Sequence, residues 1–319
     1  MQLGIFLDAR NPPPWQRPWP DHYRRIIELV EEAERLGADA VWMTEHHFVE
    51  DGYLPQPLTL AAALAARTSR IRLGTAIVLA ALRHPVHLAE EAALVDVLSG
   101  GRVELGMGAG YVKAEYAAFG VDLDRRFDLT DATLVEVRRL LDQGVVTPPP
   151  SQRPFPLWLG YQGPKGARRA GRLGVGLLTL NPASVEPYRE GLAEGGWDPS
   201  SARMGGVVDL IVADDPEAAL ERVLPHYAYQ VDSYRLAQGA PALGLEGLRA
   251  KVRGTTVLGL SVLTPDDAVA ALSARTAGMP VEHVYVWATI AGLSDDLVDR
   301  HLELVFTQVG PALRAPAPG

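Results

Sequence analysis

The chain alternates short apolar runs with amphipathic helical segments along almost its whole length. Eight runs are rich in Val, Ile and Leu without strict apolar–polar alternation, which is typical of strands buried on both faces of a parallel sheet. These runs are Gln2–Leu7, Ala38–Thr44, Ile71–Leu79, Arg102–Met107, Leu157–Gly160, Gly176–Leu180, Gly206–Val212 and His283–Ala288. Eight strands with intervening helices predict an α/β fold, the (β/α)8 TIM barrel. A doubly wound open sheet is the alternative.

The segments between these runs carry helical periodicity. In the first segment, Tyr23 to Leu36, apolar residues recur with a period of about 3.6 residues. Asp21 is a candidate N-cap of this helix, and Gly37 is a candidate C-terminal cap. The other predicted helices are Leu58–Thr68, Pro85–Leu98, Asp128–Leu141, Lys165–Leu173, Asp215–Leu224, Pro265–Thr276 and Asp295–Leu313.

Two stretches interrupt this rhythm. Thr147-Pro148-Pro149-Pro150 predicts a stiff connector before the fifth strand. Residues 225–282 are too long for one crossover, so they predict an insertion over the barrel mouth between strands seven and eight. We expect a single domain over residues 1–319, with a frayed Pro-rich tail at 315–319.

Composition disfavours several classes of function. The formal net charge of −9 argues against nucleic acid as a partner, because binding a phosphate backbone needs a basic surface. The absence of Cys rules out disulfides, thiolate metal ligands and a Cys nucleophile, and it fits a reducing cytoplasm. The apolar run Leu3–Leu7 is too short for a signal peptide, and no stretch reaches the length of a membrane span. We therefore expect a cytoplasmic protein without a membrane partner.

A carboxylate and two imidazoles follow the second predicted strand, in the sequence Thr44-Glu45-His46-His47. Polar residues at the carboxyl end of a barrel strand favour a catalytic role, and His is the usual proton handler near neutral pH. A metal site is disfavoured, because adjacent histidines on a strand point to opposite faces. His84 and His87 could chelate, but no set of carboxylate partners accompanies them.

Two glycine-rich loops follow later strands. Gly106-Met107-Gly108-Ala109-Gly110 is either a tight turn or a wall that lets a flat ring approach the backbone. Gly160 to Ala167 leaves the fifth strand and opens a helix. The free N–H groups of that helix start and the nearby Lys165 favour a phosphate site, although an ordinary βα loop is the alternative. Tyr111 and Tyr161 are placed to flank a planar ligand, whereas Trp42 and Trp158 are expected in the core.

Several motifs together resemble the bacterial luciferase-like flavin-dependent monooxygenases. They are Trp42–Phe48, Leu73–Leu79, His84–Val86, Leu98–Arg102 and Phe119–Asp122. Their order and spacing match from residue 1 to about residue 180, and the C-terminal part matches only through Val284–Ala288 and the final helix. The combination is specific, although no single motif is. The resemblance implies a TIM barrel that binds reduced FMN or, in a sister branch, the deazaflavin F420.

The resemblance also implies roles for individual residues. His46 corresponds to the catalytic acid and base, Glu45 to a residue that supports it and the flavin, and Ala76-Ile77 to a non-prolyl cis peptide beneath the flavin ring. No metal ligand is implied. The implied cofactor-binding positions are Thr75, Ala76, Ile77, Gly108, Gly110, Tyr111, Arg126, Tyr161, Gln162, Gly163, Lys165 and Gly166.

This sequence departs from the luciferase at three positions. Ala109 and Phe127 stand where the luciferase has basic phosphate ligands, so loop amides with Arg126 and Lys165 would have to compensate, or the cofactor is not FMN. Gly108 replaces a reactive Cys beside the flavin, so light emission is not implied.

The resemblance implies a monooxygenase in which oxygen adds to the reduced flavin to give a C4a-hydroperoxide that oxygenates a small organic substrate. No nicotinamide motif is apparent, so a separate flavin reductase is expected as a partner. An F420-dependent hydride-transfer enzyme is the alternative, and a flavin-binding protein without catalysis is a third possibility that the motif Glu45-His46 disfavours. A homodimer is the family expectation, and the sequence does not identify the substrate.

Overall fold

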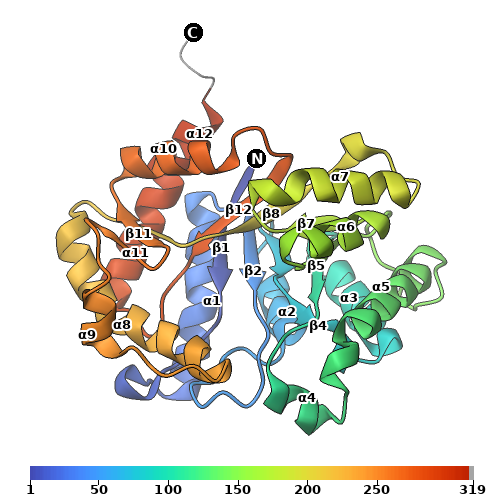
Figure 1. The fold of residues 1–319 in the computed structure, drawn as a ribbon, viewed down its shortest axis with the longest axis horizontal. Helices are drawn as coiled ribbons and strands as arrows, with labels where there is room; N and C mark the ends of the chain where they lie inside the picture. The colour runs from blue at the N-terminus through green and yellow to red at the C-terminus, as the bar shows by residue number, and fades with distance from the viewer. Residues whose placement is uncertain (316–319) are drawn as a thin grey trace.

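The computed structural model describes residues 1–315 and shows a closed parallel barrel surrounded by helices (Figure 1). The strand order is β3-β2-β1-β12-β8-β7-β6-β5-β4, and a pairing of β3 with β5 closes the sheet. Since β3 and β4 both pair with β5 and follow each other directly, they occupy one barrel position, and the (β/α)8 prediction is confirmed. The strands are β1 (Gln2–Leu7), β2 (Ala40–Met43), β3 (Arg72–Thr75), β4 (Val78–Leu79), β5 (Val103–Gly108), β6 (Leu157–Leu159), β7 (Gly176–Leu178), β8 (Met204–Val208) and β12 (Val281–Trp287).

Helices cover the outside of the barrel, mostly where the sequence predicts them. Asp21 is not the N-cap of α1 but lies in its first turn, while Gly37 ends the helix in the left-handed conformation, as expected. The sequence predicts neither α4 nor α7, and it predicts the end of α8 at Leu224, although that helix continues to Ala237. The helices are α1 (Trp19–Leu36), α2 (Pro57–Arg67), α3 (Pro85–Ser99), α4 (Lys113–Phe119), α5 (Arg126–Asp142), α6 (Gly163–Arg172), α7 (Val185–Glu194), α8 (Pro216–Ala237), α9 (Gly244–Arg249), α10 (Pro265–Thr276), α11 (Asp295–Leu304) and α12 (Gly310–Arg314), with a π-helical turn at Val305–Val309.

The barrel strands are buried on both faces, as their unbroken apolar composition indicates. Every residue of β2 and of β5 is buried. Trp42 and Trp158 are fully buried inside the barrel and pack edge to face with ring centroids 5.9 Å apart. Their predicted place in the core is confirmed.

The seventh predicted strand, Gly206–Val212, is in fact two strands in two sheets. β8 ends at Val208, whereas β9 (Leu210–Val212) joins a separate sheet with β11 (Leu260–Leu263) and β10 (Thr256–Val257). At the break, Asp209 accepts a hydrogen bond from Nε1 of Trp287 at 2.7 Å. The insertion between the seventh and eighth barrel strands is confirmed, and its predicted start at residue 225 falls inside α8. That residues 1–319 form one domain remains a prediction.

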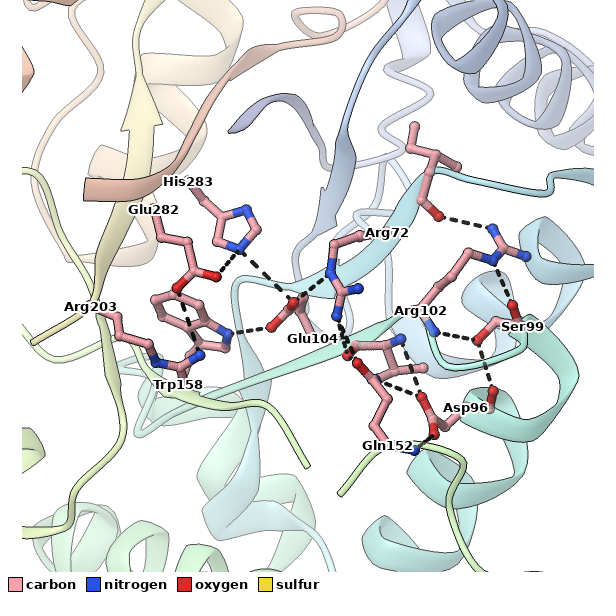
Figure 2. A network of polar contacts seen from close by, with 12 residues as sticks. Arg72, Asp96, Ser99, Arg102, Glu104, Gln152, Trp158, Arg203, Glu282 and His283 are labelled. Carbon is pink, nitrogen blue, oxygen red and sulfur yellow. Dashed lines mark hydrogen bonds and ion pairs between the residues drawn. The ribbon is translucent and has the colours of Figure 1, made fainter. Parts of the chain in front are cut away.

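A buried polar network crosses the amino-terminal end of the barrel (Figure 2). Glu104 accepts hydrogen bonds from Nε of Arg72 at 2.5 Å and from Nε1 of Trp158 at 2.7 Å. Nε2 of His283 lies 3.9 Å from Oε1 of Glu104, and neither ring nitrogen has a hydrogen-bond partner among residues 1–315. Burial raises the pKa of Glu104, and burial together with the charges of Arg72 and Arg203 lowers the pKa of His283 to about 3.

Two further expectations from the sequence concern the C-terminal tail and the absence of a membrane span. Of the tail expected to fray at residues 315–319, positions 316–319 lie outside the described residues. Within the described part, no helix combines the length and the apolar character needed to span a membrane.

Candidate active site

A cavity of about 400 Å³ opens at the carboxyl ends of the barrel strands, the end at which TIM-barrel enzymes carry their active sites. In Figure 1 this is the lower end, because β1 runs downward from the marked N-terminus towards the level of α4. The lining residues are Phe6, Thr44, Glu45, His46, Tyr53, Ala76, Ile77, Leu79, Ala109, Gly110, Tyr111, Phe127, Gly160, Tyr161, Gln162 and Tyr234.

His46 is oriented by a carboxylate that the sequence analysis does not identify. Nδ1 of His46 lies 2.8 Å from Oε1 of Glu115 in α4, and the same oxygen accepts a hydrogen bond from the backbone N–H of His47 at 2.7 Å. Since a carboxylate can only accept, Nδ1 carries the proton, and in the neutral ring Nε2 is left as the proton acceptor. The Glu115 side chain is 1% exposed, so the pair is shielded from water on that side.

Glu45 does not contact His46 but binds its neighbours. Oε1 of Glu45 accepts from Nε2 of His47 at 2.9 Å and from Arg83 at 3.0 Å, and Oε2 accepts from the backbone N–H of Leu79 at 3.0 Å. The two histidines therefore face different ways: His46 lines the cavity, whereas His47 packs against Phe119 at the end of α4. Glu45 still lines the cavity, and it ties the motif to the floor through Leu79.

The floor of the cavity is Ala76-Ile77, whose peptide bond is cis, as the resemblance implies. Two glycines flank the side chain of Ile77: a Cβ at Gly108 would lie 2.7 Å from it, and a Cβ at Gly160 would lie 2.5 Å from it. Any larger residue at either position would force the side chain of Ile77 to move. Gly108 at the end of β5 and Gly160 after β6 therefore leave room for the Ile77 side chain in the floor.

Three tyrosines form the wall around His46. The rings of Tyr53 and Tyr111 have their centroids 4.6 Å and 5.6 Å from the imidazole, both edge to face. The hydroxyl of Tyr53 lies 3.0 Å from that of Tyr234, which α8 carries in from the insertion. Arg10 lies behind this wall, with its guanidinium 4.3 Å from the centre of the Tyr53 ring.

A second cavity of about 530 Å³ shares Phe127, Tyr161 and Gln162 with the first and continues along α6. Its remaining lining residues are Lys165, Gly166, Arg168, Arg169 and Arg172. The three arginines are engaged in ion pairs: Arg168 and Arg172 with Glu194, and Arg169 with Asp128 and Asp131. Lys165 has no ion-pair partner among the described residues, and the first turn of α6 has no side-chain cap.

The structure brings most of the predicted site residues together. Four of them line neither cavity. Thr75 is buried and exchanges hydrogen bonds with the backbone of Gly106, Gly108 packs on Ile77, and Gly163 begins α6. The guanidinium of Arg126 lies over the Phe127 ring and donates to the carbonyl of Leu123.

Four residues of the site escape the sequence analysis: Tyr53, Arg83, Glu115 and Tyr234. Glu115 follows His46 by 69 residues, and Tyr234 follows Tyr53 by 181. The only local signal for Glu115 is a carboxylate in a helix soon after the glycine-rich loop. Among residues 1–315, no group of three or more His, Cys, Asp or Glu side chains is arranged to hold a metal ion.

The residues present fit a flavin mononucleotide. The floor is the apolar Ala76-Ile77 segment, and Gly110 and Gly160 line the cavity beside it without side chains, so a flat ring can lie against this surface. At the α6 end, uncapped N–H groups and the unpaired Lys165 offer an anion its hydrogen bonds and counter-charge. The wall between them carries the proton acceptor Nε2 of His46.

Curated relatives match parts of the chain. The alkanal monooxygenase alpha chain of Photorhabdus laumondii is 31% identical over 144 residues, 45% of this chain and 40% of the relative. The oxygenase component of the flavin-dependent trigonelline monooxygenase of Acinetobacter baylyi is 42% identical over 94 residues, 30% of this chain and 26% of the relative. The F420-dependent glucose-6-phosphate dehydrogenase of Amycolatopsis mediterranei is 29% identical over 191 residues, 53% of this chain and 57% of the relative. The matches thus span about half or less than half of these relatives' lengths.

Solved structures match over nearly the whole chain. Monooxygenase RslO1 from Streptomyces bottropensis has a TM-score of 0.81 at 26% identity, covering 98% of this chain and 99% of its own. The oxygenating constituent of 3,6-diketocamphane monooxygenase from Pseudomonas putida, in complex with FMN, has a TM-score of 0.73 at 20% identity, covering 99% of each chain, a likeness of fold. A family model described as luciferase-like monooxygenase matches residues 1–296. This chain therefore belongs to the luciferase-like monooxygenase family, as its motifs indicated.

Proposed function

We propose that this protein is a flavin-dependent monooxygenase that uses reduced FMN and O2 to oxygenate a small organic substrate. The observation that carries the proposal is the position of His46. It is fixed by Glu115 on the wall of a cavity whose floor is Ala76-Ile77 and whose far end leads to Lys165. A proton acceptor beside a flat floor, with an anion site beyond it, suits a flavin mononucleotide and a reacting substrate.

When bound, the flavin would supply the electrons and activate O2. The residues of this chain would position the reactants, move a proton and exclude water. Nε2 of His46 accepts or returns a proton, and Glu115 keeps the ring in the tautomer that exposes Nε2. Glu45 is proposed to act on the floor through Leu79, not on His46 directly. The insertion covers the mouth through Tyr234, which helps to exclude water from the site.

The flavin is proposed to arrive already reduced, from a separate flavin reductase. The trigonelline monooxygenase relative is named as an oxygenase component, which supports such a division of labour. A homodimer and a place in the cytoplasm also remain proposals.

An F420-dependent hydride-transfer enzyme is the second candidate, favoured by the row of cations along α6 and by the glucose-6-phosphate dehydrogenase relative. The acidic tail of F420 would need several free cations at the mouth. The arginines on α6 are already paired with carboxylates, which leaves Lys165 alone with its charge uncompensated among the described residues. One free cation suits a single phosphate, so FMN is the proposed cofactor.

Anaerobic titration with reduced FMN and with reduced F420, followed by rapid mixing with oxygenated buffer, tests the proposal. We expect reduced FMN to bind more tightly than F420, and oxidised flavin to appear more slowly with the protein than without it. Lys165→Ala should weaken FMN binding roughly ten- to a hundredfold, as expected for losing a hydrogen bond to a charged group. Lys251→Ala, a lysine that lines neither cavity, is the matched control. Tighter binding of F420, with no effect on flavin oxidation, would favour the second candidate.

A further inference from the structure

The two ends of the active-site region differ in charge. The end along α6 carries the four cations Lys165, Arg168, Arg169 and Arg172, whereas the lining of the main cavity contains no Lys or Arg among the described residues. In the main cavity, Tyr53, Tyr111 and Tyr234 form the side around His46. If the flavin phosphate binds at the cationic end, the space left for a substrate is the side of the cavity lined by the tyrosines.

One guanidinium and two carboxylates lie behind the tyrosines. Arg10 lies over the rings of Tyr53 and Tyr234, at 4.3 Å and 5.0 Å from their centres. It is held by two buried carboxylates, Asp8 at 3.2 Å and Asp51 at 2.9 Å. Both carboxylates are buried and already engage the single guanidinium, so Arg10 is not free to neutralise an anionic ligand. An anionic substrate would be buried here without a counter-charge, which is unfavourable.

The same wall offers one unused hydrogen-bond donor. The hydroxyls of Tyr53 and Tyr234 lie 3.0 Å apart, and a single hydrogen bond joins them. Two hydroxyls carry two protons, so one proton lies between the oxygens and the other remains available. Both tyrosines line the cavity, and burial raises the pKa of Tyr234 to about 12, so the pair stays protonated and can donate to a neutral oxygen.

The rings themselves favour a flat, apolar molecule. Tyr53 and Tyr111 present their aromatic surfaces around His46, and aromatic groups pack on one another with a preference beyond the area that they bury. We propose that the tyrosine side of the cavity binds an uncharged aromatic substrate bearing a hydroxyl or carbonyl oxygen, and that the Tyr53–Tyr234 hydroxyl pair recognises this oxygen. This proposal names a substrate class for the proposed monooxygenase and rests on that function.

Calorimetric titration of the protein, without flavin and again saturated with oxidised FMN, tests this assignment. The probes are naphthol, methylnaphthalene without the oxygen, hydroxynaphthoate with a negative charge, and octanol without the rings. We expect naphthol to bind about fivefold more tightly than methylnaphthalene, the factor of one net hydrogen bond. Hydroxynaphthoate and octanol should both bind more weakly than naphthol in each form of the protein.

The double variant Tyr53→Phe/Tyr234→Phe should bind naphthol and methylnaphthalene equally, because both hydroxyls are removed while the rings stay. Tyr227→Phe is the matched control, since its hydroxyl donates to the carbonyl of Leu258 outside the cavity, and it should keep the preference. Octanol or hydroxynaphthoate binding as tightly as naphthol, or an unchanged preference in the double variant, would overturn the proposal. These titrations need no turnover, so they can fail while reduced FMN still binds, or succeed while it does not.

Discussion

Two buried clusters of charged side chains lie at opposite ends of the barrel, and the main cavity borders the one at the carboxyl end. At the amino-terminal end, Glu104 is enclosed by Arg72, Trp158 and His283 (Figure 2). At the carboxyl end, Glu115 is just as deeply buried, but the imidazole that it holds lines the cavity. A buried carboxylate near a histidine is therefore no sign of a catalytic site by itself, and what distinguishes the two ends is access for a ligand.

The two histidines show the same difference. His283 is buried with both ring nitrogens unpartnered among the described residues, and its lowered pKa keeps it neutral. His46 has one nitrogen fixed by Glu115 and the other available to a ligand. We expect changes at the carboxyl end to alter the reaction, and changes at the amino-terminal end to alter stability.

Replacing the cavity histidine should have the largest effect. His46→Gln removes the proposed proton acceptor, so kcat should fall roughly 10²–10⁴-fold, while the free energy of unfolding changes little. The measurement is turnover of a substrate found by the binding titrations, alongside urea unfolding. His47→Gln is the control, because His47 bonds to Glu45 and does not line the cavity, and it should lose far less activity. Full turnover by His46→Gln would show that His46 is not the proton acceptor of the reaction.

At the opposite end, Glu104→Ala should break the network without touching the reaction. It leaves the guanidinium of Arg72 partly buried without its carboxylate, which should cost about 3–5 kcal/mol of unfolding free energy. Glu282→Ala removes a carboxylate that is 39% exposed, and it should cost no more than about 0.5 kcal/mol. Urea unfolding measures both. A loss of flavin affinity in Glu104→Ala with unchanged stability would show that the two ends are not separate.

The sequence predicts the barrel better than it predicts the partners of His46, the proposed catalytic histidine. The first strand, Gln2–Leu7, is predicted to the residue, because an apolar run buried on both faces is a local signal. Glu115 and Tyr234 reach the site from α4 and from the insertion, and which distant helix lies over the barrel mouth is set by packing, not by local pattern. The apolar run Gly206–Val212 likewise does not reveal that its two halves join different sheets on either side of Asp209.

Glu115 is a positioning residue in this comparison, and its replacement should have a smaller effect than that of His46. Glu115→Gln keeps the shape but removes the charge that holds Nδ1, so kcat should fall roughly ten- to a hundredfold, the range for a hydrogen bond to a charged group. Glu115→Asp should recover part of the rate. A stability loss without any loss of kcat would mean that Glu115 only supports α4.

The last prediction concerns how the free energy of unfolding depends on pH through His283. Its pKa is about 3 in the folded protein against 6.5 for an ordinary histidine, so between these values the unfolded chain binds a proton that the native protein does not. Stability therefore falls as the pH drops below about 6.5, and this one group should contribute roughly 2 kcal/mol of that loss by pH 5. His283→Leu removes the titrating group, so the difference in unfolding free energy between pH 7 and pH 5 should shrink by about that amount. The buried His301, whose pKa is lowered to about 4, remains in the variant, so some acid sensitivity should persist. Equal pH dependence in the two proteins would show that the imidazole of His283 is hydrated or paired in solution. The amino-terminal cluster would then be accessible to water, and the contrast with the cavity at the carboxyl end would be lost.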